Sequence, residues 1–344
     1  MKKFMFKSLF MTAVLLVSIG AVQADELRKE FNHTFQVTKG HTLKIDTRFS
    51  NVDIVKNNAD EIKVEAYIEV SNGKNRQKLI DNFELLFNQS GDVATIETKF
   101  PKSMNIKNLD VHIKIMMPMY INTNLDVKYG NLYVSELAGT ENEIKIGFGN
   151  FKADVIASKT NEISLSYVDR ADIGYIVSGT FDVNFSHLKI KKIDSYSGKS
   201  SYSEIVIDQI NTLNLPVTKF DEWEVGSVNS LDADSRYSEF DITMLNKSLV
   251  LNANFGEFDI ERTSKDFELI KIKASYTDCD VNIDAGASYT IEAYGSYADI
   301  DVPDNFKGTL KEKSLSVEIN GQVGESPKGK VTINTSFGDV DLDD

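Results

Sequence analysis

Tyr237-Ser238-Glu239-Phe240-Asp241-Ile242 and Phe255-Gly256-Glu257-Phe258-Asp259-Ile260 are two copies of one pattern: an aromatic residue, a small one, a polar one, and then apolar residues at alternate positions. Aligning every copy on its aromatic residue gives Phe49, Tyr129, Phe148, Tyr167, Phe185, Tyr202, Phe220, Tyr237, Phe255, Tyr276, Tyr297 and Phe337. From Tyr129 to Tyr297 the spacings are 19, 19, 18, 17, 18, 17, 18, 21 and 21 residues. A period of about 19 residues indicates a repeat architecture.

Two apolar columns follow the aromatic residue, three and five positions after it. The first holds Val52, Leu132, Phe151, Leu188, Ile205, Trp223, Phe240, Phe258, Cys279, Ile300 and Val340, and the second holds Ile54, Val134, Ala153, Ile190, Ile207, Val225, Ile242, Ile260, Val281, Val302 and Leu342. Alternate apolar positions predict a strand with one buried face. The copy after Tyr167 departs from the pattern, because Arg170 and Asp172 take these places and Ile173 suggests a one-residue bulge.

A second alternating run precedes most of the aromatic residues, so each repeat is read as strand, tight turn, strand and return. A unit of this size cannot bury its own apolar face, so neighbouring units must stack. The predicted fold is all-β: a single-stranded β-solenoid, parallel β-helix-like, with about 19 residues per rung and an N-terminal β cap region. An antiparallel sandwich is the alternative, but it gives no reason for columns that agree from copy to copy. The low count of 5 Pro fits strands that are paired on both sides.

The chain divides into three parts: a signal peptide at 1–24, a cap region with the first rung at 25–120, and solenoid repeats at 121–344. The first part has Lys2, Lys3 and Lys7, an apolar run, and Val22-Gln23-Ala24 as a cleavage site. Removing its three lysines changes the formal charge from -14 to -17. We expect an acidic, exported bacterial protein of the periplasm or cell surface, with no transmembrane segment in the mature chain.

The two ends of the solenoid are expected to differ from its middle. In the cap region, residues 75–88 have helical spacing, although an alternating run within them also permits a strand, and strands are expected near 94–100 and 111–117. At the other end, residues 320–330 are expected to form one surface loop. The acidic last residues, 339–344, are expected to discourage end-to-end stacking as a terminal strand.

The repeated unit, together with the opening Phe35-Gln36-Val37-x-x-Gly40-x-x-Leu43-x-Ile45, resembles a bacterial domain-of-unknown-function family of putative adhesins with β-strand repeats. The resemblance covers about residues 31–344. It implies a β-solenoid of the cell envelope, and it brings no catalytic residues that could be transferred to this chain.

Few residues point to catalysis. A formal charge of -14 argues against nucleic acid as a partner. His33, His41, His112 and His187 lack zinc-type spacing, and Cys279, the single Cys, falls in a core column. His187 and Glu204 are expected to meet across adjacent rungs, either as an acid-base pair or as a surface ion pair. We therefore expect no enzyme, no catalytic residues and no cofactor.

Two outward columns become acidic toward the C-terminus. Among their carboxylates, those considered for a metal are Glu239, Glu257, Asp278 and Asp299 in one column, and Asp241, Asp259, Asp280 and Asp301 in the other. Calcium could relieve their repulsion, but the glycine- and aspartate-rich repeat of calcium-binding β-rolls is missing. The other interpretation is a solvated face that keeps the protein soluble.

The twelve aligned aromatic residues, six Phe and six Tyr, are expected to form a stacked ladder at one corner. A structural role and a sugar-binding role both fit this pattern. The function predicted first is a non-enzymatic envelope protein, a monomer that acts as an adhesin or scaffold for an envelope protein or glycan. The alternatives are a carbohydrate-binding module that uses the Tyr/Phe edge and a calcium-dependent surface protein.

Overall fold

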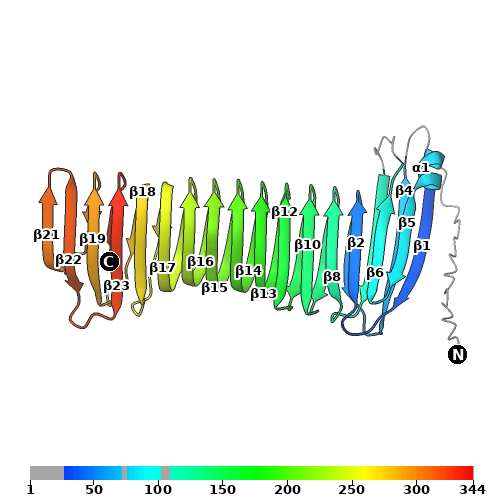
Figure 1. The fold of residues 1–344 in the computed structure, drawn as a ribbon, viewed down its shortest axis with the longest axis horizontal. Helices are drawn as coiled ribbons and strands as arrows, with labels where there is room; N and C mark the ends of the chain where they lie inside the picture. The colour runs from blue at the N-terminus through cyan, green and yellow to red at the C-terminus, as the bar shows by residue number, and fades with distance from the viewer. Residues whose placement is uncertain (1–26, 72–75, 102–108, 344) are drawn as a thin grey trace, which may run out of the picture.

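The computed structural model describes residues 27–71, 76–101 and 109–343, which form an all-β fold with one short helix (Figure 1). The signal peptide expected at 1–24 lies outside the described residues. The first part of the chain contains β1 (Leu27–Gln36), β2 (Thr42–Arg48), β3 (Asn51–Lys56), β4 (Glu61–Val70), α1 (Arg76–Asn82), β5 (Glu84–Ser90), β6 (Val93–Lys99) and β7 (Leu109–Met117). Within the described ranges no helix is long and apolar enough to cross a bilayer.

The rest of the chain is a series of strands joined by short turns. Its first half contains β8 (Asn122–Lys128), β9 (Asn131–Leu137), β10 (Glu141–Gly147), β11 (Asn150–Ile156), β12 (Thr160–Ser166), β13 (Arg170–Asn184), β14 (His187–Ser201), β15 (Glu204–Lys219), β16 (Glu222–Arg236) and β17 (Glu239–Ile260). Its second half contains β18 (Leu269–Asn282), β19 (Tyr289–Ser296), β20 (Ile300–Asp301), β21 (Lys307–Lys313), β22 (Ser316–Val323), β23 (Gly329–Ser336) and β24 (Val340–Asp343).

Strands of successive repeats pair in parallel, so equivalent residues face one another. The strands formed by the run before each aromatic residue pair with one another. β10 pairs with β8 and β12, which aligns Ile144 with Leu125 and Ile163. The run after the aromatic residue pairs β9 with β11, which aligns Leu132 with Phe151. From β13 onward a single long strand covers both runs, and β13 to β18 pair one after another. The result is one large, mostly parallel sheet.

Antiparallel pairs occur at the two ends of this sheet. At one end β4 lies between β1 and β7, and β5 pairs with β6. At the other end β22 lies between β19 and β21. Among the described strands, β1, β5, β20 and β21 each pair with a neighbour on one side only, so the sheet is open.

The two apolar columns face the interior. Of the predicted core residues, Val52, Ile54, Phe240, Ile242, Phe258, Ile260, Cys279, Val281 and Ile300 are buried, and Val302 is half-buried against the core. The departure after Tyr167 has a simple cause. One extra residue lies in the turn, so Ala171 and Ile173 are the buried pair and align with Phe151 and Ala153. The extra residue is therefore in the turn and not in a strand bulge.

The C-terminal strands are not at the end of the sheet, which corrects the expectation from the sequence. β23 lies between β18 and β19 (Figure 1). The pairing of β24 places it between β18 and β20. After β18 the chain leaves one strand position empty and continues in β19 and β20. After the β21–β22 hairpin it returns, and β23 and β24 occupy the empty position beside β18. The acidic residues of β24 therefore cannot protect the end of the sheet. The outermost strand there is β21, whose residues are all exposed.

Two other expectations also need adjustment. Residues 76–90 contain both elements that their pattern allowed, because α1 is followed directly by β5. The loop expected at 320–330 is shorter, because residues 320–323 belong to β22 and 329–330 to β23. Gly321 packs so closely on Gly308 in this hairpin that an added Cβ would lie 2.7 Å from the Gly308 Cα. Two facing glycines let β21 and β22 approach and continue the pairing.

Phe258→Asp tests the inward columns. Phe258 is 1% exposed, stacks on Phe240 at 4.3 Å and faces Cys279, so the variant would place an unpaired charge in the core. We expect loss of soluble protein with a β-type circular dichroism spectrum. Glu261→Gln, at an exposed position nearby, is the control and should fold normally. A folded Phe258→Asp protein would contradict the burial of this column.

Candidate functional site

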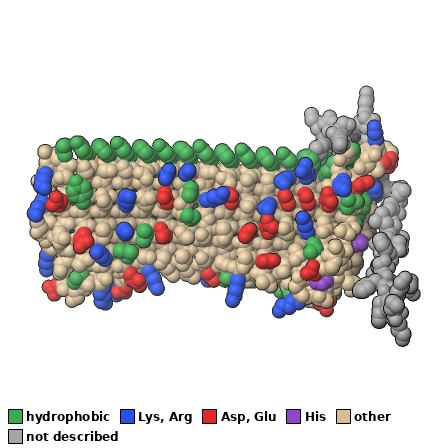
Figure 2. Space-filling model, in the orientation of Figure 1, with side chains coloured by type: hydrophobic (Ala, Val, Ile, Leu, Met, Phe, Trp, Pro, Cys, Tyr) green, Lys and Arg blue, Asp and Glu red, His purple; other side chains and the backbone are tan. Residues whose placement is uncertain are grey.

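The aligned aromatic residues form one continuous row, here called the aromatic ridge, along one edge of the molecule (Figure 2). Eleven centroid distances of 4.8–5.1 Å join the rings, with interplanar angles of 2–18°. These steps give the ridge a length of about 54 Å. Apart from Phe49, which is half-buried, each ring is between 42% and 55% exposed.

Every residue of the ridge has a left-handed backbone, with φ between 51° and 58°. This conformation costs an L-residue about 1–2 kcal/mol, and bulky side chains rarely adopt it. Stacking offsets the cost, because a ring pair contributes about 0.5–1.5 kcal/mol, and burying about 100 Å² of each ring adds roughly 2.5 kcal/mol. The sharp turn between the two strands of a repeat is therefore stabilised by the neighbouring repeats.

The order of the rings in space differs from their order in sequence. Phe337 stacks between Tyr276 and Tyr297, because β23 and β24 fill the gap between β18 and β19. The spatial order is Phe49, Tyr129, Phe148, Tyr167, Phe185, Tyr202, Phe220, Tyr237, Phe255, Tyr276, Phe337 and Tyr297. Phe and Tyr alternate without exception, which places a hydroxyl at every second rung.

Stacking leaves the ring edges, and not the ring faces, open to solvent. Each interior ring has a stacked neighbour on both of its faces. The ring centroids of Tyr202 and Phe220, for example, are 4.8 Å apart. A sugar therefore cannot lie flat on an interior ring. Contact with a ligand would involve ring edges and tyrosine hydroxyls. If the ladder binds sugars, it therefore does so without stacking them on its interior ring faces.

The first outward column beside the ridge, here called the near acidic column, has one carboxylate per rung over seven rungs. Register and backbone hydrogen bonds align Glu204, Glu222, Glu239, Glu257, Asp278, Asp339 and Asp299. His187 precedes them, and its Nε2 lies 3.1 Å from the Glu204 Oε2. Both side chains are exposed, so this pair is a surface ion pair without an enclosed site around it.

A shallow hollow joins the ridge to the near acidic column. Its lining includes Tyr202, Phe220 and Tyr237 from the ridge together with Glu222 and Glu239 from the column. Residues of the ridge and of the near acidic column therefore line the same shallow hollow over several rungs.

The second outward column, here called the far acidic column, brings like charges together. It aligns Asp259 with Asp280, Asp280 with Asp341, and Asp341 with Asp301, while Asp241 lies at the equivalent position of an earlier rung. Burial, together with repulsion from Asp259 and Asp343, raises the pKa of Asp280. Burial, together with repulsion from Asp280 and Asp301, raises the pKa of Asp341. Within the described residues, no group of three His, Cys, Asp or Glu side chains could hold a metal ion.

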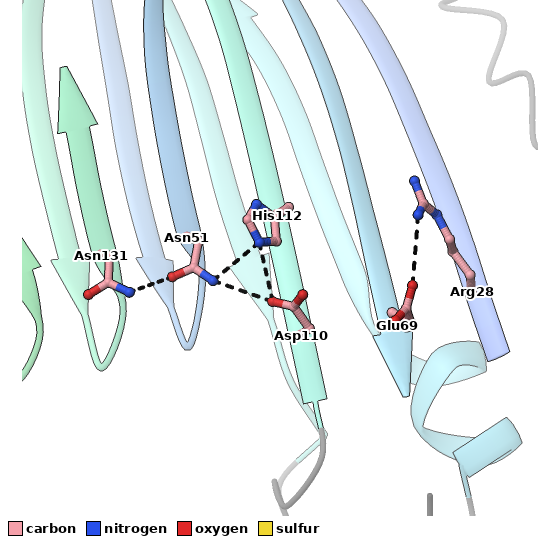
Figure 3. A network of polar contacts seen from close by, with 6 residues as sticks. All are labelled: Arg28, Asn51, Glu69, Asp110, His112 and Asn131. Atoms are coloured by element: carbon pink, nitrogen blue, oxygen red, sulfur yellow. Dashed lines mark hydrogen bonds and ion pairs between the residues drawn. The ribbon is translucent and has the colours of Figure 1, made fainter. Parts of the chain in front are cut away.

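Toward the N-terminus the near acidic column holds asparagines in place of carboxylates. There Asn150, Asn131 and Asn51 donate side-chain hydrogen bonds from one to the next, and Asn51 Nδ2 also donates to Asp110 Oδ1 at 3.3 Å (Figure 3). His112 lies beside this chain, 3.5 Å from Asp110. Because these amides hydrogen-bond to one another, this part of the column stabilises the stacked strands. Within the described residues, the unpaired carboxylates of the column lie in its C-terminal half.

Asp221 is a buried carboxylate directly beneath the ridge. Its oxygens accept hydrogen bonds from the hydroxyls of Ser200 and Thr218, at 2.7 and 2.6 Å, and from the backbone N–H groups of Ser203 and Lys219, both at 2.9 Å. Burial raises its pKa, and these hydrogen bonds oppose the rise. Sequence patterns gave no sign of this residue, except that an acid occupies a column otherwise filled by small residues.

Neither a family profile nor a curated protein matches the chain. Solved structures do match. A putative cell adhesion protein from Clostridium sporogenes ATCC 15579 has 13% identity and a TM-score of 0.20, with 92% of this chain and 99% of that chain covered. A putative adhesin from Bacteroides fragilis NCTC 9343 has 11% identity and a TM-score of 0.28, with 91% and 97% covered.

A third similar structure is a putative lipid binding protein from Parabacteroides distasonis ATCC 8503, with 9% identity, a TM-score of 0.29, and coverage of 91% of this chain and 96% of that chain. Likeness at these identities and TM-scores carries no conclusion about function.

Asp341→Asn tests the repulsion in the far acidic column. Because the pKa of Asp341 is raised in the folded state, its ionised form opposes folding, and this penalty grows as pH rises through the raised pKa. At pH 7 we expect the variant to be more stable by about 0.5 kcal/mol. Its advantage in thermal unfolding should shrink as pH falls toward the ordinary Asp value of 3.8. Asp208→Asn, an exposed control, should show neither effect, and a less stable Asp341→Asn protein would refute the repulsion.

Asp221→Ala tests the buried carboxylate. The variant leaves four donors without their acceptor, so we expect a loss of about 2 kcal/mol or more in unfolding free energy, measured by denaturant unfolding. Asp221→Ser, which introduces the residue found at the equivalent Ser203 and Ser238, should lose less. Equal stability of the wild type and the Ala variant would show that Asp221 does not stabilise the turn.

Proposed function

We propose that this chain is an exported, non-enzymatic protein of the bacterial envelope. In this proposal it is a rigid β-solenoid with an N-terminal β cap region that acts as an adhesin or scaffold and presents the aromatic ridge to a partner. The parallel register of equivalent columns supports the solenoid, and the antiparallel strands before β8 support the cap. The basic and apolar sequence at 1–24 supports export.

The observation that carries the proposal is the exposed area of the ridge. Eleven rings are 42–55% exposed, which amounts to about 1,100 Å² at roughly 100 Å² each. The largest apolar patch on an ordinary soluble monomer is about 300–600 Å², whereas a stable interface needs about 800 Å² per partner. A ridge of this size is therefore best explained by contact with a partner.

Among the alternatives from the sequence, glycan binding is favoured by the regular row of tyrosine hydroxyls. Calcium-dependent adhesion has less in its favour, because the described carboxylates stand in rows and do not converge on one point.

Replacing ridge residues by Asn tests the proposal. Asn tolerates a left-handed backbone better than other side chains, so Tyr202→Asn, Phe220→Asn and Tyr237→Asn together should remove three rings while keeping the turns. We expect this triple variant to fold but to lose most of its co-sedimentation with envelope fragments of the producing bacterium.

The control is a pair of exposed tyrosines outside the ridge, Tyr133 and Tyr294, each changed to Asn. Circular dichroism and thermal unfolding check the fold of every variant. If the folded ridge variant sediments with the envelope as well as the wild type does, the ridge is not the adhesive surface and the proposal fails.

A further inference from the structure

The C-terminal half of the ridge and the near acidic column form a strip with three regular features. Ring edges occur at every rung, a tyrosine hydroxyl occurs at every second rung, and a carboxylate occurs at every rung. One shallow hollow is lined by Tyr202, Tyr237, Glu222 and Glu239, so ridge and column border the same space there. We propose that this strip binds an extended β-1,4-linked amino polysaccharide, a polymer of glucosamine type, along the axis of the stacked rungs. The inference rests on the proposed function and names its ligand class.

The negative charge of the strip indicates which class of ligand it can attract. Glu222, Glu239 and Glu257 have no ion-pair partner within the described residues, and they are neighbours in a column that continues with Asp278, Asp339 and Asp299. Such a row repels anionic polymers and anionic lipid surfaces and attracts protonated amines. It also opposes a second copy of the chain in parallel, because the two acidic columns would meet.

The spacing of the strip distinguishes a polysaccharide from a basic peptide. The rings repeat every 4.8–5.0 Å along this half of the ridge. Side chains on one face of an extended peptide repeat every two residues, or about 6.7 Å, and so fall out of step with the rungs. One sugar of an extended β-1,4-linked chain advances by close to one rung and stays in step over several rungs.

The alternation of Phe and Tyr matches the same ligand. Successive sugars of an extended β-1,4-linked chain are turned over relative to one another, so the chemical repeat is two sugars. The tyrosine rings of Tyr202, Tyr237 and Tyr276, each with one hydroxyl, recur every two rungs, with two centroid steps adding to about 9.7 Å. Stacking alone does not require this order, because Phe and Tyr rings stack equally well at a solvent-exposed edge. A hydrogen-bonding partner with a two-rung period does require it.

The binding mode follows from the covered ring faces. The sugars would lie across the ring edges, accept or donate hydrogen bonds at the tyrosine hydroxyls, and direct alternate amines to the near acidic column. Each contact is weak, so affinity has to come from many rungs acting together. We therefore expect affinity to rise with oligomer length until the chain spans the seven rungs of the column.

The test is calorimetry of the purified protein with glucosamine oligomers of increasing length. Two triple variants separate the contributions: Tyr202→Phe, Tyr237→Phe and Tyr276→Phe, which keeps every ring, and Glu222→Gln, Glu239→Gln and Glu257→Gln, which keeps every side-chain size. We expect each triple variant to weaken binding of the longest oligomer about tenfold or more. Binding should also weaken with salt.

Matched controls use the same substitutions away from the strip. Tyr133→Phe with Tyr294→Phe removes exposed hydroxyls outside the ridge, and Asp208→Asn, Glu261→Gln and Asp266→Asn remove exposed carboxylates outside the column. These variants should bind as the wild type does. N-acetylated oligomers of the same length, which lack the charge, should bind more weakly, and an oligolysine of equal charge should bind without sensitivity to the Tyr→Phe changes.

Three results would overturn the inference: no binding of the glucosamine oligomers, binding that either triple variant leaves unchanged, or oligolysine binding that is equally tight and equally sensitive to the Tyr→Phe changes. Light scattering of the protein alone reports self-association through the ridge, which would also overturn it. Failure here is distinct from failure of the adhesive role. If envelope co-sedimentation is lost in the Asn ridge variant while glucosamine oligomers do not bind, the ridge is adhesive toward another ligand.

Discussion

The left-handed aromatic turn is the constraint on which the rest of this structure depends. A single Phe or Tyr with φ near 55° would be strained, and one repeat on its own could not hold it. Stacking at 4.8–5.1 Å makes each turn stable only beside another turn of the same kind. The ring spacing equals the spacing of hydrogen-bonded strands, so the same contact also fixes the register of the parallel sheet.

Register explains why so much of the fold could be predicted from sequence. In a parallel stack, equivalent residues face one another, so a buried column in space is a column in the aligned repeats. Phe240, Phe258 and Cys279 were recognisable as one core column before their contacts were known, and they are neighbours in the structure. The exception after Tyr167 was also visible, but its cause was not, because an extra turn residue and a strand bulge shift the pattern equally.

The order of the rungs could not be predicted from sequence. A repeat period shows that the units are equivalent, but it does not show which units are neighbours in space. β24 fills a gap left by β18 and β20, and only this insertion places Phe337 between Tyr276 and Tyr297. The alternation of Phe and Tyr is therefore hidden in the sequence, where two Tyr copies follow one another. Asp221 could not be recognised for a different reason, since two of its partners, Ser200 and Ser203, come from the neighbouring repeat and only Thr218 is close to it in sequence.

The two acidic columns differ in physical consequence, although they look alike in the sequence. In the far column, Asp280 and Asp341 have raised pKa values because of desolvation and repulsion from neighbouring carboxylates, so their charge costs stability. In the near column, Glu222 and Glu239 line a shallow hollow together with ridge residues, and Glu257 continues the same column at the next rung. A surface that only needed solubility would not require carboxylates in step with a row of rings and hydroxyls. The rings and carboxylates repeat at every rung and the hydroxyls at every second rung, and a ligand with a matching repeat could recognise this arrangement.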